Sequence, residues 1–89
     1  MNISKHEQRV LHVLAQGGSI HYLRGQDGNR GGKVLEIICF TRDGHVLSDC
    51  TMEIFTRLKK RRFIRSRGSK PYRITHLGRA SVRPQLDNR

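Results

Sequence analysis

The sequence has no tryptophan, only two cysteines and no long apolar run. Its longest apolar stretches, such as residues 37–40, are far shorter than the roughly 20 residues that a membrane-spanning helix needs. The first residues lead directly into an amphipathic pattern and do not resemble a signal peptide. These absences argue against a membrane protein and predict a cytoplasmic location.

The two cysteines are Cys39 and Cys50. Without a signal peptide we expect reduced thiols in the core rather than a disulfide. A metal site could combine both thiols with His45, but the CxxC spacing of zinc sites is missing and no fourth ligand is evident. We therefore expect neither a metal nor a cofactor.

Acidic residues are missing from a long part of the chain. Residues 54–86 contain no Asp or Glu and eleven Lys or Arg, whereas residues 1–53 hold six of each sign. Nearly the whole net charge of +11 therefore lies toward the C-terminal end. One interpretation is a solvated, solubilising face. We favour a surface that attracts an anionic partner, either nucleic acid or an acidic protein.

The length of 89 residues predicts one domain over residues 1–89, with 84–89 as a frayed tail after Pro84. Periodicity and turn residues predict an α+β fold in the order α-β-β-β-α-β-β-α. The expected helices cover residues 4–16, 51–61 and 75–83. The expected strands cover residues 19–24, 33–41, 45–48, 63–66 and 72–75, and the first three of them form a meander.

Local signals support these boundaries. Ser4 and Glu7 form a capping box, and Gly17 and Gly18 end the first helix. The glycine-rich segment 25–32 lacks the Gly-Lys-Ser/Thr of a phosphate-binding loop, so we expect a hairpin loop. The expected buried positions are Met52, Phe55 and Leu58 in the second helix and Leu77, Ala80 and Val82 in the third.

A helix with cationic side chains followed by a basic hairpin is typical of a winged helix, in which the hairpin contacts phosphates. The helix 51–61 lacks Asn and Gln, so nothing predicts base-specific contacts. The candidate residues for binding a partner or nucleic acid are Arg57, Lys59, Lys60, Arg61, Arg62, Arg65, Arg67, Lys70 and Arg73.

Catalysis has little support in the sequence. Five histidines are scattered without metalloprotease spacing. Tyr72, Arg73 and His76 could serve an RNA-cleaving toxin by transferring protons and stabilising charge at a phosphate. We expect a binding protein rather than an enzyme.

Several segments together resemble the YjhX family of small bacterial proteins. They are residues 4–18, 47–51 (Leu-Ser-Asp-Cys-Thr), 71–75 (Pro-Tyr-Arg-Ile-Thr), Gly78 and 87–89 (Asp-Asn-Arg). The resemblance implies the toxin of a toxin–antitoxin pair, which binds and inhibits DNA topoisomerase I and has an acetyltransferase-like antitoxin. It supplies no functional residues, so the basic surface is inferred from the sequence itself. A DNA-binding winged-helix regulator is the chief alternative, and an RNA-cleaving toxin is the third.

Overall fold

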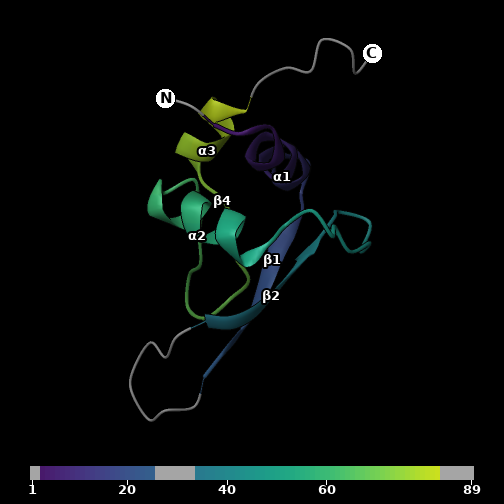
Figure 1. Ribbon diagram of the computed structural model, residues 1–89, viewed down its shortest axis with the longest axis vertical. Helices are drawn as coiled ribbons and strands as arrows, with labels where there is room; N and C mark the ends of the chain where they lie inside the picture. Colours follow the sequence, from purple (N-terminus) through teal and green to yellow (C-terminus); the bar gives the residue numbers. More distant parts are fainter. Residues whose placement is uncertain (1–2, 26–33, 83–89) are drawn as a thin grey trace.

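The described part of the chain, residues 3–25 and 34–82 of the computed structural model, contains three helices and two small antiparallel sheets (Figure 1). The elements in order are α1 (Lys5–Ala15), β1 (Ser19–Arg24), β2 (Val34–Phe40), α2 (Met52–Lys60), β3 (Ile64–Arg65), β4 (Arg73–Ile74) and α3 (His76–Ser81). The three helices lie close together, and the β1–β2 hairpin extends away from them. The predicted loop at 25–32, apart from Gly25, and the predicted tail at 84–89 lie outside the described residues.

Helix α1 begins and ends as predicted. The Ser4 hydroxyl accepts a 3.1 Å hydrogen bond from the Glu7 N–H, and a Glu7 carboxylate oxygen accepts one of 3.2 Å from the Ser4 N–H. Gly17, with φ of 113°, has the left-handed conformation that ends the helix. The capping box is therefore confirmed.

The two sheets are joined by an isolated bridge between Ile20 and Tyr72. Strand β1 pairs with β2, and β3 pairs with β4. Ile20 of β1 also exchanges two backbone hydrogen bonds with Tyr72, of 3.0 and 2.8 Å, which places β1 beside the β3–β4 hairpin. This hairpin follows α2, as the sequence predicted.

The predicted third strand at 45–48 is wrong. A tight turn at Gly44, with φ of 90°, brings Val46 opposite Phe40, but this is an isolated bridge. The chain turns again at once, because the Cys50 N–H donates to the Leu47 carbonyl just before α2 begins. Too few residues separate the two turns for a strand, so the described order is α-β-β-α-β-β-α.

The core is formed by residues of α1, β1, β2, α2 and the β3–β4 hairpin with its flanking residues. Its buried apolar residues are Val10, Leu11, Leu14, Ile20, Cys39, Ile54, Phe55, Leu58, Phe63, Ile64 and Tyr72. The predicted burial of Met52 is wrong, because Met52 is exposed. Ile54 is the buried residue in the first turn of α2. Cys39 is a buried free thiol of the core, and the free thiol Cys50 is partly buried against it.

Helix α3 packs differently from the prediction. Leu77 and Ala80 are exposed, and the buried residue is Gly78. A Cβ at Gly78 would lie 2.4 Å from the Phe63 carbonyl oxygen, so the helix approaches the β3 backbone through a residue without a side chain. This close approach turns Leu77 outward. Among the described residues no helix is long and apolar enough to cross a membrane.

Candidate anion-binding groove

A groove of about 1000 Å³ lies between the end of α2, the β3–β4 hairpin and the start of α3. Six cationic side chains line it: Lys59, Arg62, Arg65, Arg67, Lys70 and Arg73. Ile64, Pro71, Ile74 and Leu77 supply apolar surface, and Thr75 and His76 complete the lining. Among the residues that the structure describes, no Asp or Glu contributes to it. The groove thus combines uncompensated positive charge with an apolar floor.

The end of α2 places Arg62 at the groove. The Arg62 N–H donates to the Lys59 carbonyl and the Phe63 N–H to the Leu58 carbonyl, each at 3.0 Å. This pair of bonds is a Schellman motif, in which the residue after the C-cap is usually glycine. Here that residue is Arg62, with φ of 63°. The motif buries Phe63 beside Leu58 and leaves the Arg62 side chain exposed at the groove.

The turn between β3 and β4 carries two further cations. The Lys70 N–H donates a 3.0 Å hydrogen bond to the Arg67 carbonyl, and Gly68 and Ser69 between them both have positive φ. The Ser66 hydroxyl donates to the Lys70 carbonyl and lies 3.3 Å from the Tyr22 hydroxyl of β1. These contacts attach the turn to the domain. The hydrogen bond with Ser66, together with the nearby Arg24, also lowers the pKa of Tyr22.

Lys59 is held at the groove by the aromatic core. Its ammonium lies 6.0 Å from the centre of the Phe55 ring and 5.9 Å from that of Tyr72. The two rings make an edge-to-face contact with centres 5.0 Å apart. A cation this close to aromatic rings is attracted by their π-electrons. The contact keeps one positive charge near the place where α2 meets the hairpin.

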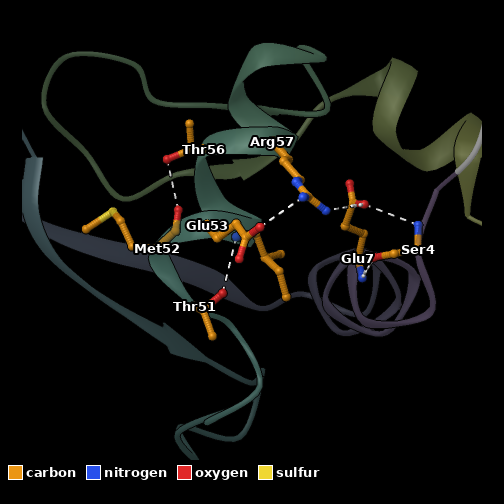
Figure 2. A network of polar contacts seen from close by, with 8 residues as sticks. Ser4, Glu7, Thr51, Met52, Glu53, Thr56 and Arg57 are labelled. Carbon is orange, nitrogen blue, oxygen red and sulfur yellow. Dashed lines mark hydrogen bonds and ion pairs between the residues drawn. The ribbon is translucent and has the colours of Figure 1, made fainter.

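The other three predicted cations lie elsewhere. Arg57, Lys60 and Arg61 line a smaller pocket of about 570 Å³ beside Ser4 and Glu7. Figure 2 shows the Arg57 guanidinium between two carboxylates, 2.8 Å from Glu53 and 3.9 Å from Glu7. Its charge is therefore largely compensated, which separates Arg57 from the cations of the groove.

Sequence reasoning missed the buried carboxylate in this network. Glu7 is 1% exposed, and its Oε2 atom has no hydrogen-bond partner in the described part of the chain. Glu7 lies three, four and seven residues before Val10, Leu11 and Leu14, so its place on the buried stripe of α1 was visible in the sequence. Its contact with Arg57 was not, because the two residues are far apart along the chain.

The structure brings together two of the three residues considered for RNA cleavage. Arg73 and His76 line the groove, but Tyr72 is a core residue, 5% exposed, that packs against Phe55 and Tyr22. Tyr72 thus lies apart from the other two, in the core. The hydrogen bond to Cys39 and burial raise the pKa of the Cys50 thiol, which makes Cys50 a poor nucleophile. The same hydrogen bond lowers the pKa of Cys39, but this thiol is buried in the core.

Comparison with known proteins identifies the family. Residues 1–89 match the YjhX toxin family, described as "Putative toxin of bacterial toxin-antitoxin pair". A UPF0386 protein of Beijerinckia indica is 58% identical over 89 residues, which cover 100% of both chains. UPF0386 proteins of Ruegeria sp. and Aliivibrio fischeri are each 53% identical, again over 100% of both chains. No solved structure shows a significant match to the chain.

The protein is thus a small mixed α and β domain with a basic groove. The chain is a member of the YjhX toxin family. The resemblance noted in the sequence is confirmed along its whole length. Membership of a toxin–antitoxin pair also implies an antitoxin partner.

Proposed function

We propose that this protein is a toxin that binds DNA topoisomerase I through the basic groove and inhibits it without catalysing a reaction. The observation that carries the proposal is the grouping of six cations around an apolar floor, with no acidic residue in the lining over residues 3–25 and 34–82. Charges of one sign in a concave site focus the electrostatic field and speed the approach of an anionic partner. The apolar floor adds contact area that a purely electrostatic surface lacks.

The choice of target and antitoxin rests on the resemblance described from the sequence. The resemblance implies topoisomerase I as the target and an acetyltransferase-like antitoxin, and both act in the cytoplasm. The groove suits an acidic surface of the enzyme because arginine side chains bind carboxylates in a fixed, two-pronged geometry. Four of the six groove cations are arginines: Arg62, Arg65, Arg67 and Arg73.

A DNA-binding regulator of the winged-helix type is the second candidate. The basic β3–β4 hairpin that follows α2 favours it, since such a hairpin contacts phosphates in winged-helix proteins. The two candidates differ in their response to salt. For duplex DNA the logarithm of the affinity falls by about 0.9 per phosphate contact for each tenfold rise in salt.

Direct binding to the enzyme in the absence of DNA tests the proposal. A groove variant, Arg67→Glu/Lys70→Glu, is compared with a control variant, Lys5→Glu/Arg42→Glu, which makes the same charge change at exposed residues outside the groove. We expect immobilised topoisomerase I to bind the wild type and the control, and to lose the groove variant. Binding of the wild type to duplex DNA alone would instead favour the regulator.

A further inference from the structure

The β1–β2 hairpin has an exposed apolar face that the groove does not use. Leu23 is 57% exposed, Ile38 46% and Val46 63%. The pairing of the strands places these three side chains on one face of the sheet, because residues opposite each other in antiparallel strands share a face. His21 pairs with Ile38, Leu23 with Glu36, and Phe40 with Val46.

The other face of the same hairpin is already used by the core. Ile20 pairs with Cys39 and Tyr22 with Ile37, and these residues are buried or pack against the buried cluster. Strand β2 is therefore apolar on both faces, a pattern typical of strands covered on both sides. In the described chain only one side is covered, and Figure 1 shows the hairpin extending away from the helices.

One edge of β2 also lacks a partner strand. On one side β2 pairs with β1 along its length. On the other side, within residues 3–25 and 34–82, pairing is confined to its end, where the Leu47 N–H donates to the Cys39 carbonyl and Phe40 bridges Val46. The edge over residues 34–38 has no such pairing. An unpaired edge beside an apolar face is the arrangement to which an extended segment of another protein adds as a strand.

The charge of the chain argues against a second copy as the occupant. Each copy carries a net charge of +11, and such a charge keeps proteins monomeric by mutual repulsion. The exposed face itself is nearly neutral, since Glu36 is the only Asp, Glu, Lys or Arg among its paired residues. The occupant is therefore a different protein, bound by backbone pairing and apolar contact rather than by charge.

We propose that the antitoxin covers this face, adding an extended segment to the free edge of β2 with apolar side chains over Leu23 and Ile38. The family pairs the toxin with an antitoxin, and the hairpin is a surface separate from the groove proposed for the target. The proposal rests on the family and not on topoisomerase I. The antitoxin thus binds a site at which the toxin does not contact its target.

Co-purification tests this site, with the protein encoded beside the toxin gene as the probe. Ile38→Asp changes the exposed face, and Leu77→Asp is its matched control, because Leu77 is a similarly exposed leucine in the groove. Circular dichroism verifies that both variants fold. We expect the wild type and Leu77→Asp to form a complex with the probe, and Ile38→Asp to bind at least about tenfold more weakly.

Three results would overturn the proposal. The first is equal binding of the probe by the wild type and Ile38→Asp. The second is a wrong binding pattern: the wild type forms no complex with the probe, or Leu77→Asp loses the complex while Ile38→Asp keeps it. The third is a dimer of the toxin on its own that Ile38→Asp dissociates, since a second copy would then cover the face. The binding of topoisomerase I by the groove is tested separately, with the variant Arg67→Glu/Lys70→Glu.

Discussion

The Thr75 hydroxyl donates a 2.8 Å hydrogen bond to the carbonyl oxygen of Arg62. The same hydroxyl accepts from the Gly78 N–H at 3.0 Å and so caps α3. Both Thr75 and Arg62 line the groove, and the contact fixes the start of α3 to the end of α2. The position of Arg62 at the groove therefore depends in part on one hydroxyl group.

Replacing Thr75 with valine should destabilise the domain. The change removes the cap of α3 and leaves the Arg62 carbonyl without its side-chain donor. We expect a loss of about 1–2 kcal/mol in the free energy of unfolding, measured in urea. Thr75→Ser keeps the hydroxyl and should retain most of the stability. Equal losses in the two variants would show that the hydroxyl has no such role.

Replacing Arg62 with glycine should separate stability from binding. Glycine adopts a φ of 63° without the steric cost that a side chain brings. The stability should therefore stay the same or rise by up to about 1 kcal/mol. The inhibition of topoisomerase I should weaken, because the groove loses a cation. A clear fall in thermal stability would contradict the conformation described for this helix end.

Arg57 and Arg67 should differ in their importance for inhibition. Arg57 is compensated by Glu53 and Glu7, whereas Arg67 lies in the groove, whose lining has no acidic residue. We expect Arg57→Met to change the inhibitory concentration little and Arg67→Met to raise it severalfold. Arg57→Met should also lower the free energy of unfolding, because it removes the counter-charge 3.9 Å from the buried Glu7 carboxylate. A larger effect of Arg57→Met on inhibition would place the contact on the face of α2.

Replacing Gly78 with alanine should destabilise the fold. The new Cβ would lie 2.4 Å from the Phe63 carbonyl oxygen and 2.7 Å from the Ile74 side chain, so α3 would have to move. We expect a cost of about 1–3 kcal/mol, measured by thermal or chemical unfolding. Gly44→Ala is a contrasting variant, because a Cβ there would meet no atom within 4 Å and only the φ of 90° opposes it. A smaller cost at Gly78 than at Gly44 would contradict the close approach of α3.

Signals within single elements predicted much of the fold. The capping box at Ser4 and Glu7 depends on residues three positions apart, and it is present. The third strand failed because its residues lie between two turns. The burial of Leu77 failed because apolar character does not reveal that the backbone of α3 approaches β3 at Gly78.

The sequence predicted which residues belong to the candidate site, but it did not predict which of them lie together. Nine cations were identified from the sequence, and six of them line one groove. The separation of Arg57 depends on its contact with Glu7, which comes from tertiary packing. The apolar floor was also hidden, since Ile64, Ile74 and Leu77 are brought together only when the hairpin packs against α3.

A plasmid relaxation assay with topoisomerase I tests the central claim most directly. The wild type, the groove variant Arg67→Glu/Lys70→Glu and the control variant Lys5→Glu/Arg42→Glu are each titrated against the enzyme, with a gel shift on the same plasmid. The account predicts a block near one toxin per enzyme for the wild type and the control, little gel shift, and no block by the groove variant. Unimpaired relaxation with a salt-sensitive gel shift of the wild type would contradict it.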